Sequence, residues 1–249
     1  MPIFNIKYIL KRIPVVLNAF FNHLTPKMIH GLLIKEIQYK RKVAKKLQDL
    51  NWSEINLQIN PYSANWSFLY VLLEFLTEKK PKKILELGSG ETTKLTYKFV
   101  QENPNKTALV LEENKEWYNQ LEKKFRTPRF EYLHKPLVKK KVAGHKTTWY
   151  SYEFANQKKL FNLIIIDGPT GTYNYSRLGI VKYLTDILHR KDFLIMLDDS
   201  KRRGEKQTLK MIKKKLQSEE IDYASIHCYG RKRQTCIFSP NLESFFNQL

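Results

Sequence analysis

Apolar positions along this chain change period several times, and each change predicts the boundary of an element. Between residues 62 and 238, short apolar runs alternate with longer segments whose apolar residues recur every three or four positions. The runs predict strands at 84–87, 107–111, 129–133, 160–166, 193–197, 223–229 and 234–238. The amphipathic segments predict helices at 62–78, 93–101, 115–125, 177–189 and 207–216. Such alternation with wholly apolar strands indicates an α/β protein with a doubly wound parallel sheet, and the closing hairpin adds an antiparallel edge.

The N-terminal part of the chain follows a different pattern. Residues 1–55 are predicted to form a basic amphipathic helical extension, ahead of one domain over 56–249. Ten Lys and Arg but only two acidic residues fall in positions 1–50. Around Pro14, which starts or kinks a helix, apolar and basic residues are mixed, and 28–50 are predicted to form a longer helix. Such an extension can cap the core of the domain or lie on an anionic membrane, and the two roles can coexist.

Composition narrows the class of protein and of partner. The 249 residues carry a net charge of +20, from 44 Lys and Arg against 24 Asp and Glu. This charge favours an anionic partner, namely nucleic acid, an anionic lipid surface or an acidic glycan, unless the lysines only decorate solvated faces. No run of 18 apolar residues and no secretory signal occurs, and the two cysteines are expected to be reduced. These features predict a cytoplasmic protein, with peripheral contact to the inner membrane surface as an option.

The first candidate site is the turn after the strand at 84–87. Glu86-Leu87-Gly88-Ser89-Gly90 places an acid and two glycines between a strand and a helix, which brings bare backbone up to a ligand. Thr93 stands where a dinucleotide fingerprint has its third glycine, and the P-loop pattern is absent. Glu86 would repel a pyrophosphate and suits a ligand with positive charge. S-adenosylmethionine carries a sulfonium and an ammonium and no phosphate, so it fits, although an ordinary turn would also give this pattern.

An acidic pair ends the second predicted strand. Glu112 follows Gly90 by 22 residues, which is the position from which an acid takes both ribose hydroxyls of a nucleoside. Glu113 comes next and is a second candidate for cofactor contact. The alternative is that Glu112 or Glu113 is an exposed acid at the N-terminus of the following helix.

Three more acids end two later strands. Asp167 follows the most apolar run of the chain, and Asp198 and Asp199 follow the next strand. If these strands are neighbours, the three carboxylates meet at the edge where open α/β sheets bind their ligands. Oxygen ligands suit Mg²⁺, Ca²⁺ or Mn²⁺, and one carboxylate could instead act as a general base. Alternatively, Asp199 caps the next helix and Asp198 pairs with Lys201 or Arg202.

The order of these motifs resembles a known family. Glu86-x-Gly88-Ser89-Gly90, Glu112 and Asp167 together look like the class I S-adenosylmethionine-dependent methyltransferases. Within that family, the chain is similar to small O-methyltransferases found with glycan or polysaccharide biosynthesis. That similarity rests on five motifs, Glu112-x-x-x-Glu116-Trp117, His134-x-Pro136-Leu137, Trp149-Tyr150, Asp167-Gly168-Pro169-x-Gly171 and Asp198-Asp199-x-x-Arg202-x-x-Glu205. The resemblance covers about residues 60–240.

The resemblance implies a fold and a set of roles. The strand order would be 3-2-1-4-5-7-6 with the last strand antiparallel. The cofactor-binding residues it implies are Glu86, Gly88, Ser89, Gly90, Thr92, Glu112, Glu113, Pro136, Leu137 and Asp167. Pro136 and Leu137 would flank the adenine, and Asp167 would face the methyl group and the acceptor. Metal-dependent catechol-type relatives use acids at these strand ends, so Asp167, Asp198 and Asp199 are the candidates for catalysis and for a divalent cation, although no lysine follows Asp167 to act as base.

Three functional hypotheses remain open at this point. The first is a methyltransferase acting on a hydroxyl of a sugar or glycan intermediate, with Arg177, Arg202 and Tyr173 predicted to contact an anionic acceptor. The second is an RNA or nucleic-acid methyltransferase, which the Asp-Gly-Pro sequence after the fourth strand disfavours for base N-methylation. The third is an inactive, membrane-associated binding protein of the same fold. The sequence predicts no oligomeric state.

Overall fold

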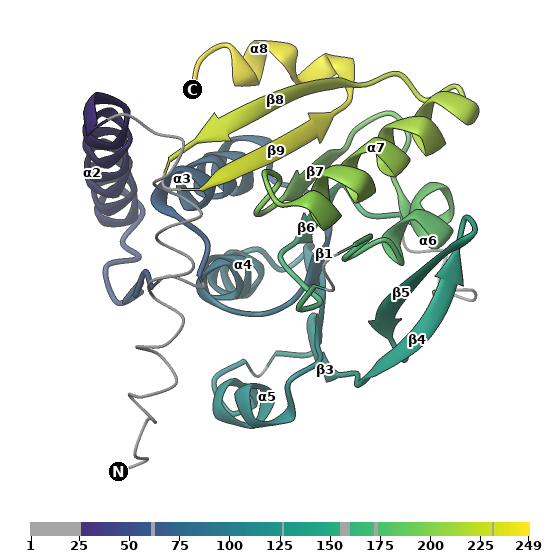
Figure 1. The fold of residues 1–249 in the computed structure, drawn as a ribbon. Helices are drawn as coiled ribbons and strands as arrows, with labels where there is room; N and C mark the ends of the chain where they lie inside the picture. Colours follow the sequence, from purple (N-terminus) through teal and green to yellow (C-terminus); the bar gives the residue numbers. More distant parts are fainter. Residues whose placement is uncertain (1–25, 61–62, 126, 155–159, 172–173, 231) are drawn as a thin grey trace, which may run out of the picture.

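A computed structural model describes residues 26–60, 63–125, 127–154, 160–171, 174–230 and 232–249 (Figure 1). Seven strands form one sheet in the order β3-β2-β1-β6-β7-β9-β8, in which β9 runs antiparallel to both of its neighbours. The strands are β1 (Lys83–Leu87), β2 (Thr107–Glu112), β3 (Phe130–His134), β6 (Leu163–Ile166), β7 (Leu194–Leu197), β8 (Ala224–Tyr229) and β9 (Arg233–Phe238). The predicted order 3-2-1-4-5-7-6 is confirmed, because an additional hairpin only shifts the numbering of the later strands.

Helices cover both faces of the sheet. Side chains alternate along each strand, so Ile84 packs into one core and Leu85 into the other. The helices are α2 (Pro26–Asp49), α3 (Trp66–Glu74), α4 (Glu91–Glu102), α5 (Lys115–Glu122), α6 (Ile180–Ile187), α7 (Arg203–Ser218) and α8 (Glu243–Phe246). A π-helical turn, η1 (Phe75–Lys79), continues α3, and the 3-10 turn η2 (Pro240–Leu242) precedes α8. The first core contains residues of α2, α3, α4, α5 and α8, and the second contains residues of α6 and α7. Because helices cover both faces of the sheet, the loops meet at its edge, where the parallel strands have their carboxyl ends.

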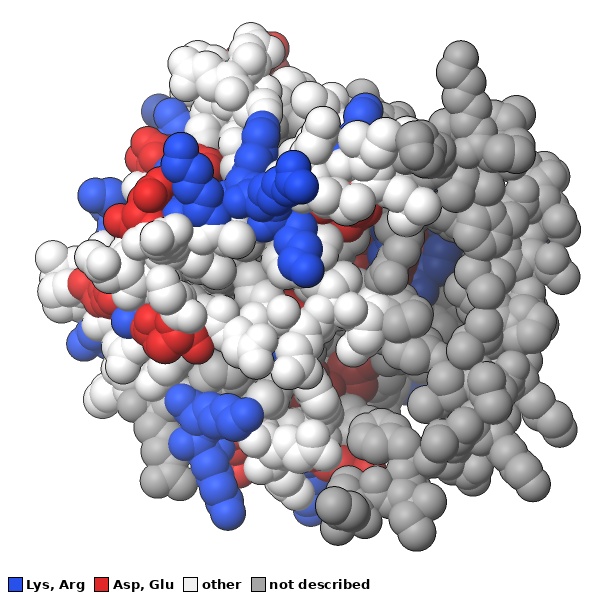
Figure 2. Space-filling model, turned by 90° about the vertical axis from the view of Figure 1, so that its left-hand side faces the viewer, with Lys and Arg blue, Asp and Glu red and all other residues white. Residues whose placement is uncertain are grey.

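Helix α2 is the described part of the N-terminal extension. Val43 and Leu47 are buried in the same core as α3, and Lys46 pairs with Glu74 at 3.0 Å. The expected capping of the domain by this helix is therefore confirmed, while the segment around Pro14 lies outside the described residues. Figure 2 views the side of the molecule on which α2 lies and shows Lys and Arg side chains in clusters there, with acidic side chains among them. Among the described helices, none has the length and apolar character that crossing a membrane requires.

A hairpin that sequence patterning did not predict lies between β3 and β6. It consists of β4 (Leu137–Val142) and β5 (His145–Tyr150), joined by a two-residue turn in which Ala143 and Gly144 both have positive φ. This is the turn that matches the twist of paired strands. The consecutive lysines 139–141 obscured the alternation of β4, because three charged residues in a row leave no period of two. By sequence, Trp149 and Tyr150 of β5 could either stack on a sugar or pack in the core, and both are buried in the second core.

Candidate functional site

The glycine turn at the end of β1 touches the loop that follows β6. Gly88 has φ 82°, and a Cβ there would lie 2.7 Å from the Gly168 backbone nitrogen. Both the conformation and the contact therefore require glycine at position 88. A Cβ on Gly90 would meet no atom within 4 Å, so the backbone of this residue borders open space. The turn thus presents main chain at the ends of two neighbouring strands, as the sequence predicted.

Glu86 is fully buried beneath this turn. Its Oε1 accepts hydrogen bonds from the hydroxyls of Thr92 at 2.6 Å and Thr93 at 2.7 Å. The Thr93 hydroxyl also accepts from the backbone N–H of Gly90 at 2.8 Å, so the residue that replaces the third glycine organises the turn. Glu86 Oε2 is buried without a hydrogen-bond partner among the described residues. Burial raises the pKa of Glu86 to about 7, against the opposing effect of nearby threonine hydroxyls, those of Thr92, Thr93 and Thr96.

Glu112 closes the turn from the end of β2. Its Oε2 accepts from both the backbone N–H of Ser89, at 2.9 Å, and the Ser89 hydroxyl, at 2.6 Å. Its Oε1 accepts from the backbone N–H of Asn114 at 2.8 Å. Glu112 is only 4% exposed, and burial raises the pKa of its carboxyl group. The alternative of an exposed acid at the helix N-terminus is therefore wrong for Glu112, because the capping side chain there is Asn114.

Glu113 spans the gap between the end of β2 and the loop after β6. Its Oε1 accepts from the backbone N–H of Thr170 at 2.6 Å, and its Oε2 accepts from the Tyr150 hydroxyl at 3.3 Å. Because β1 lies between β2 and β6, this side chain passes across the end of β1. Glu86, Glu112, Glu113 and Asp167 together give the end of β1 an acidic surrounding, which favours a cationic ligand and disfavours a phosphate.

Two aromatic residues to which the sequence analysis gave no role also border the turn. Trp117, 39% exposed on α5, donates its indole N–H to the Ser89 carbonyl oxygen at 3.0 Å. The Tyr132 hydroxyl lies 2.9 Å from the Ser89 hydroxyl. Pro136 and Leu137, predicted to flank an adenine, lie where β3 leads into β4. The sequence indicates the place of Trp117 only through its position in the first turn of the helix that follows Glu112. From this position its side chain reaches the glycine turn.

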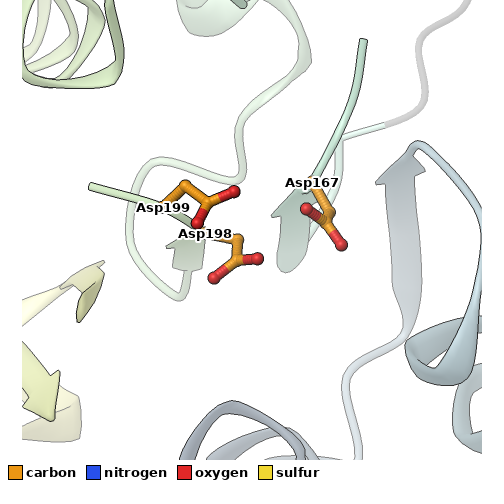
Figure 3. Close-up of side chains that lie close together, drawn as sticks. All are labelled: Asp167, Asp198 and Asp199. Carbon is orange, nitrogen blue, oxygen red and sulfur yellow. The ribbon is translucent and has the colours of Figure 1, made fainter. Parts of the chain in front are cut away.

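The three aspartates meet as the sequence predicted. β6 and β7 are parallel neighbours, and one carboxylate oxygen from each of Asp167, Asp198 and Asp199 lies within 4.8 Å of the others. Figure 3 shows the three side chains standing together where the two strands end. Asp198 is completely buried and accepts from the side-chain amide of Gln234 at 3.0 Å. We refer to Asp167, Asp198 and Asp199 as the aspartate cluster.

Two members of the aspartate cluster have pKa values that are shifted in opposite directions. Burial, and then the nearby charge of Asp198, raises the pKa of Asp167 well above its usual range. Burial would also raise the pKa of Asp198, but the Lys232 ammonium and the Arg177 guanidinium outweigh it and hold that pKa below its usual range. Asp167 is 23% exposed while Asp198 is enclosed. Asp167 is therefore the member that takes up a proton first and that a ligand can reach.

The predicted acceptor-binding residues have different environments. Arg177 is 3% exposed and donates to three backbone carbonyls, those of Ile166, Asp167 and Asp198, at 2.6–3.2 Å. This burial corrects its assignment to the acceptor, because the guanidinium instead ties together the ends of β6 and β7. Arg202 is 52% exposed and pairs with Asp199 at 2.7 Å and Glu205 at 2.8 Å, so its contact with an acceptor stays a prediction. Tyr173 lies outside the described residues.

A divalent cation fits the aspartate cluster by ligand type but not by charge. Three carboxylates are suitable ligands for Mg²⁺ or Mn²⁺. However, the Lys232 ammonium lies 3.4 Å from Asp198 Oδ2 and 3.6 Å from Asp199 Oδ1. A cation bound between Asp198 and Asp199 would share these oxygens with an ammonium. We therefore assign no metal to this site.

Comparison with known proteins identifies the fold. No family model and no curated protein sequence matches the chain. Among solved structures, an O-methyltransferase from Bacillus cereus in complex with SAH is similar, with a TM-score of 0.54, 12% identity and coverage of 85% of this chain and 100% of that one. The O-methyltransferase TomG from Streptomyces achromogenes, involved in tomaymycin synthesis and solved with SAM, has a TM-score of 0.50 and 11% identity, covering 87% and 99%. At these identities the likeness establishes the class I methyltransferase fold.

Proposed function

We propose that this protein is an S-adenosylmethionine-dependent O-methyltransferase. The observation that carries the proposal is the closure of the glycine turn by Glu112, whose Oε2 holds both the N–H and the hydroxyl of Ser89. This places an acid, a bare backbone and an aromatic side chain at one point on the end of β1. The fold, shared with SAM- and SAH-bound O-methyltransferases, supports the same conclusion.

The chemistry of the donor set fits this cofactor. Glu86 Oε2 is buried with no partner among the described residues, and a positive group bound over the turn stabilises such a carboxylate through space. Glu112 retains lone pairs that can accept from ribose hydroxyls in addition to Ser89. Trp117 offers a partly exposed ring beside the turn. An anionic cofactor would instead face four carboxylates, with Lys94 of the next helix already paired to Glu91 at 2.8 Å.

Asp167 is the residue that faces the reaction. When bound, S-adenosylmethionine would supply a methyl group made electrophilic by its sulfonium; transfer to an acceptor oxygen would break the methyl–sulfur bond and leave the neutral thioether. Asp167 lies beside the glycine turn, with its backbone N–H donating to the Leu87 carbonyl oxygen at 2.9 Å. Its carboxylate takes the proton that the acceptor hydroxyl loses, so charge and atoms balance. Its raised pKa makes the ionised form a stronger base than an ordinary aspartate. Arg177 positions Asp167, because its Nη2 donates to the Asp167 carbonyl oxygen at 2.6 Å.

The acceptor we propose is a hydroxyl of a sugar or glycan intermediate that carries an anionic group. Directly after Asp199, the side chains of Lys201, Arg202 and Arg203 are exposed at the start of α7. They lie on the segment that leaves the aspartate cluster, where a carboxylate or phosphate of the acceptor could pair with them. The net charge of +20 agrees with an anionic acceptor.

A methyl-transfer screen tests this function. The full chain is incubated with S-adenosylmethionine labelled in the methyl group and with panels of nucleotide sugars, acidic glycans and RNA. We expect label in the sugar or glycan panel, and a loss of about 10²-fold or more in Asp167→Asn. Asp186→Asn, on the exposed side of α6, is the matched control and should keep full activity. Transfer to RNA alone would replace the proposed acceptor with nucleic acid, and no transfer to any panel would contradict the function.

A second role, contact with an anionic membrane, is supported by α2. Leu33, Ile34 and Ile37 are 52%, 41% and 53% exposed on this helix, beside the exposed Lys35 and Lys40. Apolar and basic side chains together are what an interfacial helix presents to anionic lipid. Sedimentation with vesicles containing phosphatidylserine should fall for a variant with all three apolar residues changed to Ser. Unchanged sedimentation would contradict this role.

A further inference from the structure

We propose that Lys232 is the resident cation of the aspartate cluster and takes the place of a divalent metal, so that the methyl transfer proceeds without one. Lys232 lies in the turn between β8 and β9. In the sheet, β6 and β7 separate β9 from β1, the strand that the glycine turn follows. Its ammonium approaches both Asp198 and Asp199 and also donates to the Ser63 carbonyl oxygen at 3.0 Å. The inference rests on the proposed function only in naming methyl transfer as the reaction. Exclusion of a divalent cation can be measured whether or not the protein transfers methyl groups.

The position of this ammonium is built into the fold. Lys232 is 14% exposed at its side chain, and its carbonyl oxygen accepts from the Gly230 N–H at 3.1 Å and the Asn65 side-chain amide at 3.3 Å. Gly230 has no room for a Cβ, because the Glu36 carboxylate of α2 and the Asn65 amide pack against it. The turn is therefore held from one side by α2 and by the residue before α3.

The partner of Lys232 is held equally firmly. Asp198 is completely buried, and Gln234 donates to its Oδ1 at 3.0 Å. Gln234 in turn accepts from the Ser67 hydroxyl at 3.2 Å and donates to the Asn65 side-chain oxygen. A buried charge with fixed hydrogen bonds needs a fixed counter-charge, and Lys232 supplies it without any added ion.

Charge balance around the cluster points the same way. Ion pairs among the described residues join four carboxylates to three cations. The carboxylates are those of Asp167, Asp198, Asp199 and Glu205, and the cations are Arg177, Arg202 and Lys232. With all four carboxylates ionised, the group carries one net negative charge, which the two positive charges of a divalent cation would exceed. Removal of the Lys232 ammonium leaves two net negative charges, which a divalent cation neutralises.

Manganese binding tests the proposal directly. Free Mn²⁺ is titrated into the full chain and measured by its electron paramagnetic resonance signal, in the wild type, in Lys232→Met and in the matched control Lys206→Met. Lys206 is exposed on α7, and its substitution changes the net charge equally. We expect no site in the wild type or the control, and one site in Lys232→Met that is at least about tenfold tighter than any wild-type binding. A further change, Asp198→Asn in the Lys232→Met background, should remove that site.

Three results would overturn the proposal. One is a Mn²⁺ site in the wild type that Asp198→Asn abolishes. Another is the absence of any site in Lys232→Met when its circular dichroism shows a folded protein; Lys232→Gln then repeats the test with a polar side chain of similar length. The third is loss of wild-type methyl transfer on treatment with EDTA. The first two results do not depend on whether the chain binds S-adenosylmethionine, so failure of the proposed function remains distinguishable from failure of this proposal.

Discussion

Ser89 donates both its backbone N–H and its hydroxyl to a single oxygen of Glu112, at 2.9 and 2.6 Å. This pair joins the turn after β1 to the end of β2, two neighbouring parallel strands. The pair also gives a structural role to Glu112, which follows Gly90 by 22 residues. Glu86 lies before the glycine turn, and Glu112 holds the turn in place.

Ser89→Ala should weaken cofactor binding about tenfold. The substitution removes the hydroxyl donor but keeps the backbone N–H, and a hydrogen bond to a charged group is worth about 1.5–3 kcal/mol. Calorimetric titration of S-adenosylmethionine measures the change. Ser53→Ala, at an exposed position before α3, controls for the loss of a serine hydroxyl and should bind as the wild type does. Equal affinity in both variants would refute a role for the Ser89–Glu112 contact.

Glu86→Gln should stabilise the protein at pH 8. Burial raises the pKa of Glu86 to about 7, so its stabilising contribution is complete below the pKa of an unfolded glutamate, about 4.3, and is lost as pH rises through about 7. The glutamine has no charge to bury and should gain about 1–3 kcal/mol over the wild type at pH 8. Thermal unfolding between pH 4 and 8 measures this gain, which should vanish near pH 4. A gain that is the same at every pH would contradict the assignment.

The same substitution should weaken cofactor binding, because the negative charge of Glu86 is what suits a cationic ligand. Stability and binding are therefore expected to change in opposite directions in one variant, which separates the functional from the structural role of this carboxylate.

Glu36→Ala should destabilise the fold by about 1–3 kcal/mol. Glu36 of α2 accepts from the Asn65 side-chain amide at 2.9 Å and from the Trp66 backbone N–H at 3.1 Å, at the N-terminus of α3. Asn65 makes no capping bond with its own side chain, so the cap comes from the extension. Gln38→Ala, exposed on the same helix, is the control in chemical denaturation and should have little effect. An equal, small effect of both would show that α2 does not support α3.

The pH dependence of methyl transfer should report Asp167. Its carboxylate accepts a proton only when ionised, and its pKa is raised by burial and by Asp198. The rate should therefore rise with pH through a limb well above the pKa of an ordinary aspartate, with an apparent value that belongs to the Asp167–Asp198 pair. Initial rates across pH 4–9 measure the limb, and Asp167→Asn should abolish it. A limb that persists in that variant would assign the proton to another group.

Sequence patterning predicted the sheet and the site because both follow from local rules. Apolar strand runs, the Gly88 turn and the acids Glu112, Asp167 and Asp198 lie where parallel strands end, and topology then brings them together. Lys232 was not predicted, because its role depends on a turn that only the antiparallel return of β9 places beside β7. Arg177 was misassigned for a similar reason: its charge suggested an acceptor contact, whereas its neighbours are backbone carbonyls.

Calorimetric titration of S-adenosylmethionine into the full chain tests the central claim most directly. The account predicts saturable binding at one site, weakened at least about tenfold in Glu112→Ala, because the turn loses the acceptor of both Ser89 hydrogen bonds and Asn114 loses a third. Glu116→Ala, an exposed acid on α5, should bind as the wild type does. Absence of binding by the wild type, or an affinity unchanged in Glu112→Ala, would contradict the assignment of this site to a methyl-donor cofactor.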